Sequence, residues 1–88
     1  MSRMRRAKKY EEFEDEAGRT VRYRRLDEGG LVAVGAEVAL DAHVGPDAWV
    51  DPGARVLAGA RVGSRCWVEP GAVVGRQAQV GPGVHVGR

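Results

Sequence analysis

The sequence predicts an all-β fold, a parallel β-helix of about three 18-residue coils that follows a charged N-terminal arm. Three observations support this prediction: a valine at every sixth position, a small residue four positions later, and frequent glycine or proline between them. An α-helix cannot use this period, because its apolar stripe recurs about every 3.6 residues. The valines are Val32, Val38, Val44, Val50, Val56, Val62, Val68, Val74, Val80 and Val86.

Each hexad fits one short strand and one corner. Alternation within the strand turns the valine and the small residue inward, while glycine and proline suit the corners. Three hexads per coil place residues 18 apart above one another, at the usual strand spacing of about 4.8 Å. Cys66 occupies the position that most hexads give to alanine, and we expect it to be a small buried hydrophobe.

The repeat from Val32 to Arg88 resembles that of the hexapeptide-repeat (transferase hexapeptide) proteins, whose units fold as a left-handed parallel β-helix. The left hand is implied by this resemblance alone, since parallel crossovers are otherwise right-handed. The resemblance also implies a homotrimer. Many relatives are acyltransferases that use a catalytic histidine beside a groove between subunits.

Residues 1–28 form a different unit from residues 29–88. The first unit holds nine of the 14 Lys and Arg residues and seven of the 12 Asp and Glu residues, whereas the second is neutral and carries 12 of the 13 glycines. Four segments resemble bacterial and phage-encoded hexapeptide proteins of unassigned function. These segments are residues 8–11, 18–21, 29–32 and 48–50.

The N-terminal arm is predicted to form a β-hairpin that caps the first coil or reaches a neighbouring subunit. Its strands would be Lys8–Glu14 and Arg19–Leu26, with Val21 and Tyr23 at a period of two. A helix is the alternative, because Met4, Ala7, Tyr10 and Phe13 recur at intervals of three.

The outward residues form one column on each face of the prism. One column contains Glu37, Arg55 and Val73, and a second contains His43, Arg61 and Gln79. The third contains both tryptophans of the chain, and we call it the aromatic ladder: Leu31, Trp49, Trp67 and His85. An aromatic patch of this kind is rarely left exposed to solvent in a monomer. We therefore predict a subunit interface at the ladder, with coverage by the N-terminal segment as the alternative.

Neither histidine is expected to be catalytic. His43 and His85 lie on different faces, and the sequence assigns no carboxylate to orient either of them. They are also two coils apart, so one subunit cannot bring both to a zinc ion, and a third ligand is missing. We expect no metal and no cofactor.

A basic run, which we call the attachment arm, contains Arg3, Arg5, Arg6, Lys8 and Lys9. Five acidic residues at positions 11, 12, 14, 15 and 16 follow it and cancel its charge at a distance. No aromatic residues are interleaved for stacking on bases, so nucleic acid is not the expected partner.

At the other end of the chain, Arg88 follows the last hexad, and no polar cap covers the open coil. Either this end contacts a partner, or its small exposed cross-section is tolerated without one.

These observations favour a non-enzymatic structural protein, a rigid homotrimer that attaches to a larger assembly such as a phage virion. The alternatives are a minimal acyltransferase-like protein that binds an acyl-CoA substrate between subunits, and a bare trimerisation module. The chain shows no signal peptide and no membrane-spanning run. We therefore expect a location in a virion or the cytoplasm, without contact to a membrane.

Overall fold

The computed structural model describes residues 10–14 and 17–88. Within these ranges every regular element is a β-strand, and no helix is long and apolar enough to cross a membrane. The strands of the arm are β1 (Tyr10–Glu14) and β2 (Thr20–Arg25). The strands of the coils are β3 (Leu31–Ala33), β4 (Glu37–Val38), β5 (His43–Val44), β6 (Trp49–Val50), β7 (Arg55–Val56), β8 (Arg61–Val62), β9 (Trp67–Val68), β10 (Val73–Val74), β11 (Gln79–Val80) and β12 (His85–Val86).

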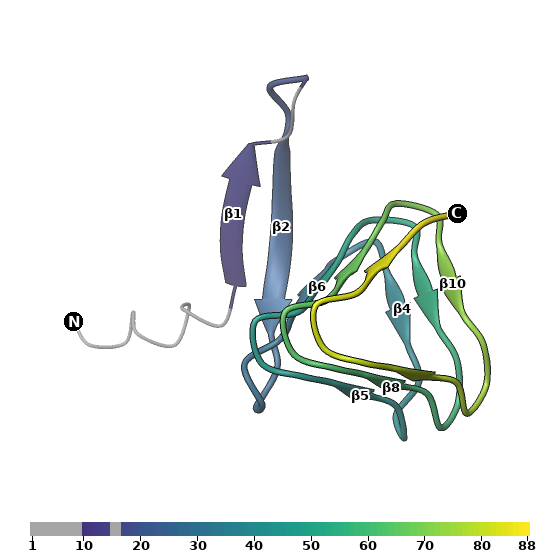
Figure 1. The fold of residues 1–88 in the computed structure, drawn as a ribbon. Helices are drawn as coiled ribbons and strands as arrows, with labels where there is room; N and C mark the ends of the chain where they lie inside the picture. The colour runs from purple at the N-terminus through teal and green to yellow at the C-terminus, as the bar shows by residue number, and fades with distance from the viewer. Residues whose placement is uncertain (1–9, 15–16) are drawn as a thin grey trace.

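The coils form a triangular prism with one parallel sheet on each side (Figure 1). The strand orders are β3-β6-β9-β12, β4-β7-β10 and β5-β8-β11. Every pair joins residues 18 positions apart, as in Val32 with Val50 and Val50 with Val68. In Figure 1 the chain passes clockwise from the side of β6 to the side of β4 and β10, and then to the side of β5 and β8, as it advances toward the viewer, which is the predicted left hand.

From β4 to β11, each hexad is a two-residue strand followed by a tight turn. At the corner after β6, the amide of Ala54 donates to the carbonyl of Asp51 over 3.1 Å, with Pro52 and Gly53 between them. Gly53 has a φ of 82°, and proline followed by a residue of positive φ is the pattern of a type II turn. The strand amides donate to the next coil, as from Trp49 to Cys66 over 2.8 Å.

The repeat valines and small residues fill a dry axis. The valines of the middle coils are at most 3% exposed, and Cys66 is buried among them with its thiol 2.9 Å from the carbonyl oxygen of Gly81. Val38, Val80 and Val86 are only partly buried, since the end coils have a neighbour on one side. The core residues are Val32, Val44, Ala48, Val50, Ala54, Val56, Ala60, Val62, Cys66, Val68, Ala72 and Val74.

The predicted hairpin is confirmed, and the helical alternative is wrong over Tyr10 and Phe13. β1 pairs with β2 antiparallel, and β2 pairs antiparallel with β3, so the hairpin extends one side of the prism. Residues 1–9, including Met4, Ala7 and the attachment arm, lie outside the described residues, as do residues 15–16.

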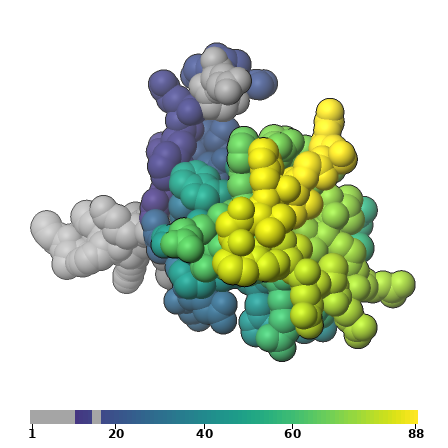
Figure 2. All heavy atoms as spheres, in the orientation of Figure 1, coloured from purple at the N-terminus to yellow at the C-terminus, as the bar shows by residue number. Residues whose placement is uncertain are grey.

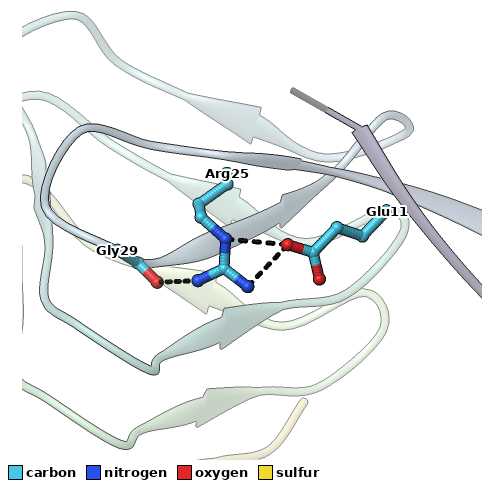
Figure 3. Close-up of polar contacts among 3 residues, drawn as sticks. All are labelled: Glu11, Arg25 and Gly29. Carbon is cyan, nitrogen blue, oxygen red and sulfur yellow. Dashed lines mark hydrogen bonds and ion pairs between the residues drawn. The ribbon is translucent and has the colours of Figure 1, made fainter. Parts of the chain in front are cut away.

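One arginine holds the base of the hairpin to the first corner (Figure 3). Arg25 donates through Nε to a carboxylate oxygen of Glu11 over 2.7 Å, and its Nη2 lies 2.6 Å from the same oxygen. Its Nη1 donates to the carbonyl of Gly29 over 3.1 Å. The guanidinium therefore joins both hairpin strands to the turn that leads into the first coil. Figure 2 shows the hairpin standing beside the prism, with the last coil at the front.

Gly63→Ala tests the stacking of one corner on the next. A Cβ at this position would lie 2.8 Å from the carbonyl carbon of Gly81 and 2.9 Å from the nitrogen of Pro82. We expect a loss of about 1–3 kcal/mol in the free energy of unfolding, because backbone cannot move aside as a side chain can. Urea denaturation measures it. The control is Gly81→Ala in the same column, where a Cβ would meet nothing within 4 Å; equal losses in both variants would contradict this packing.

Candidate functional site: an aromatic and acidic groove

The four residues of the aromatic ladder pair in register along one side of the prism. Leu31 pairs with Trp49, Trp49 with Trp67, and Trp67 with His85. Each belongs to a different coil, so the period of 18 brings together residues that are far apart in the sequence. The other two columns pair in the predicted order as well.

The hairpin covers the first half of the ladder. The ring centroid of Tyr23 lies 5.1 Å from that of Trp49, and Phe13 lies 5.5 Å from Tyr23 and 5.0 Å from Trp49, all edge to face. Leu31 is 4% exposed beneath β2. The N-terminal segment therefore covers Leu31 and much of Trp49, which was the alternative to a subunit interface for this part of the ladder.

The second half of the ladder is open. Trp67 is 45% exposed although its ring stacks on that of His85, with centroids 4.3 Å apart and planes inclined by 16°. Because the hairpin pairs at the N-terminal end of this sheet, it does not extend over β9 and β12. Trp67 and His85 thus remain on the surface of the single chain.

A buried carboxylate connects the hairpin to the ladder. Asp51 is 9% exposed and accepts hydrogen bonds from the Tyr23 hydroxyl over 2.7 Å and from Trp67 Nε1 over 2.6 Å. Both donors are neutral, so within the described residues the charge of Asp51 has no counter-ion. Hydrogen bonds to a charged group are stronger than neutral ones. Asp51 therefore fixes the orientation of the Trp67 indole relative to the hairpin.

The next coil repeats this arrangement with different residues. Glu69 lies 18 positions after Asp51, and it contacts Nε2 of His85, which lies 18 positions after Trp67. A carboxylate thus meets the ring of the following coil in two successive coils. The sequence pattern shows an acidic residue after the valine only at positions 51 and 69, where other hexads often have glycine. These two acidic residues were therefore the sequence signal from which both carboxylate–ring pairs could have been inferred.

An open groove of about 980 Å³ runs between the hairpin and the ladder. It contains three carboxylate residues, Glu14, Asp51 and Glu69, and one cationic residue, Arg19. The remaining lining residues are Phe13, Ala17, Tyr23, Trp49, Trp67 and Pro70. The groove therefore combines aromatic surface with excess negative charge.

The histidines occupy separate sites, as expected from their columns. His43 is on β5 with Nδ1 3.6 Å from a carboxylate oxygen of Glu28, and His85 is on β12 beside Glu69. Sequence reasoning assigned neither partner, because Glu28 belongs to the corner before the first coil and Glu69 to the neighbouring coil. No group of three or more His, Cys, Asp or Glu side chains in residues 10–14 and 17–88 could hold a metal ion.

The fold and the repeat together define the architecture: the coils form a parallel β-solenoid built on a six-residue repeat. Residues 41–76 match the family model described as bacterial transferase hexapeptide (six repeats). No curated protein and no solved structure matches the chain. The match covers the two coils that carry Trp49, Trp67 and both carboxylates of the ladder.

Asp51→Ala tests the junction between hairpin and ladder. Removing the carboxylate leaves the Tyr23 hydroxyl and the Trp67 N–H without their acceptor, and each such loss costs about 1–3 kcal/mol where the group is buried. We expect a lower free energy of unfolding in urea and a red shift in tryptophan emission. Glu37→Ala is the control, because Glu37 forms only an exposed ion pair with Arg55 at 3.3 Å. An unchanged stability of Asp51→Ala would contradict the assignment.

Proposed function

We propose that this protein is a non-enzymatic structural protein, a rigid β-helix that forms a homotrimer and serves as a building block of a larger assembly such as a virion. The observation that carries the proposal is the open half of the aromatic ladder. Trp67 exposes nearly half its surface next to a groove lined by aromatic and acidic residues. Exposed surface of this kind marks interfaces between proteins.

The distribution of polar residues supports the use of this face for self-association. The other two columns present mostly charged or polar side chains, including Glu37, Arg55, His43 and Arg61; Val73 is the exposed apolar exception. Homo-oligomers close by point symmetry. A threefold axis parallel to the prism would bring the ladder of each copy to the next copy, and a homotrimer is what the family resemblance implies.

The attachment arm supplies the second contact of this proposal. Its five cationic residues lie within residues 3–9, outside the described part of the chain. A segment of this charge fits an acidic surface on a neighbouring chain better than nucleic acid, since the arm has no aromatic residues for stacking on bases. In this proposal the prism is the rigid part of each subunit, and the arm joins the prism to a neighbouring chain.

Trp67→Ser tests the interface. We expect the variant to sediment as a smaller species than the parent protein, because the open part of the ladder loses its largest apolar side chain. The double variant with Trp49→Ser should have the same or a smaller mass. Sedimentation equilibrium measures the mass, and circular dichroism verifies that the β-helix remains folded.

Leu40→Ser is the matched control for this experiment. Leu40 is fully exposed at the corner after β4, away from the ladder, and its loss should leave the mass unchanged. Trp67→Phe keeps an aromatic ring but removes the N–H, and should retain the oligomer. A parent protein that sediments as a monomer, or a Trp67→Ser variant with the mass of the parent, would refute the proposed interface.

An acyltransferase-like function is the second candidate, and one observation favours it. His85 has a carboxylate partner in Glu69, as a general base requires, and Glu69 also lines the groove. In this case the groove, completed by a second subunit, would bind an acyl-CoA. Calorimetric titration with coenzyme A distinguishes the two candidates: saturable binding supports the enzyme, and no heat of binding supports the structural role.

A further inference from the structure

We infer that the groove beside Trp67 is a binding site for arginine side chains, and that its occupant is the attachment arm, residues 3–9, of a second copy of this chain. The inference rests on the proposed self-association and names the surface to which the arm binds. It follows from the charge of the groove, from the state of its buried carboxylate and from the composition of the arm.

The excess negative charge of the groove favours the binding of a cation. Glu14, Asp51 and Glu69 outnumber Arg19 among its lining residues. Asp51 has the greatest need of a cationic partner, because it is nine-tenths buried and bonded only to neutral donors within the described residues. A carboxylate offers about four lone-pair sites, so two remain after the bonds from Tyr23 and Trp67. A charge buried in this way is normally paired.

The aromatic rings select the kind of cation. The exposed indole of Trp67 donates its N–H to Asp51, and this bond increases the electron density on the ring face. Cations bind to the faces of aromatic rings, tryptophan most strongly. A guanidinium can stack on the indole and donate several hydrogen bonds in its own plane to carboxylates, whereas an ammonium is a compact point charge. The site therefore fits arginine better than lysine.

The chain itself contains a segment of this chemistry. Three arginines and two lysines fall within residues 3–9, directly before β1. Seven extended residues span about 25 Å, which is comparable to the shorter dimensions of the molecule, 29 and 20 Å. An extended arm would therefore be about as long as the molecule is wide. Its positive charge and the negative charge of the groove are complementary.

Exchange of arms also explains why the ladder is only half covered. The hairpin of each copy buries Leu31 and part of Trp49, and leaves Trp67 open. An arm from the next copy would cover the remaining half. Because arm and groove are different surfaces, the contact is heterologous, and such contacts close into rings when the rotation permits it. A threefold ring would use every arm and every groove once.

Peptide binding tests the site. The protein is the full chain with Arg3→Gln, Arg5→Gln and Arg6→Gln, and the probe is a fluorescently labelled peptide with the sequence of residues 1–9. We expect saturable binding by fluorescence anisotropy that weakens as the salt concentration rises.

The affinity should be at least tenfold lower when the protein also carries Trp67→Ser or Glu69→Gln. It should be several-fold lower for a peptide with lysine in place of the three arginines. Glu37→Gln is the control and should bind like the starting protein. Absence of saturable binding, or equal binding to the Trp67→Ser protein, overturns the inference.

Mixing of two variants tests whether the arm acts between copies. Trp67→Ser retains its arm and lacks the ring, whereas the triple glutamine variant retains the groove and lacks the arginines. Each should sediment below the mass of the parent, and a mixture should form a heteromer that neither variant forms alone. An arm bound in its own chain gives no heteromer and overturns the exchange between copies. If the triple variant keeps the parent mass while Trp67→Ser does not, the inference fails and the proposed self-association stands.

Discussion

The structure depends on the closure of three hexads around one dry axis of valine and alanine. Nearly every strand of the coils is two residues long, so a single coil makes few hydrogen bonds of its own. Its stability comes from the coil above and the coil below, to which its amides and carbonyls bond at the ordinary strand spacing. This requirement keeps the period at six and makes each corner repeat the one before it. It also forbids a Cβ where two corners touch, as at Gly45 and Gly63.

The same requirement creates the groove. Because coils stack without offset, a contact between two coils recurs 18 positions later, and the contact of Asp51 with Trp67 has its counterpart in that of Glu69 with His85 one coil further on. The hairpin adds what the repeat cannot. Its Tyr23 reaches the carboxylate of Asp51 and its Phe13 reaches Trp49, so the arm and the coils share one set of side chains. The groove lies where these two kinds of structure meet.

The groove is also the point at which the structural and enzymatic proposals diverge. Its aromatic surface and excess carboxylate favour a cationic protein segment, which a rigid building block needs for joining its neighbours. Its one histidine–carboxylate contact, between His85 and Glu69, is the arrangement that general-base chemistry would use. Both proposals place a second subunit at this face, since Trp67 and His85 are open in the single chain.

The fold could be predicted from the sequence because each hexad repeats the same local rule, and the period of 18 then determines which residues share a column. The hairpin could also be predicted, from the alternation of Val21 and Tyr23. The pairing of Asp51 with Tyr23 could not, and neither could the burial of Leu31 beneath β2. These contacts depend on the angle at which the hairpin meets the first coil, and no repeat governs that angle. Tertiary structure alone decided which half of the ladder is covered and which carboxylate is buried.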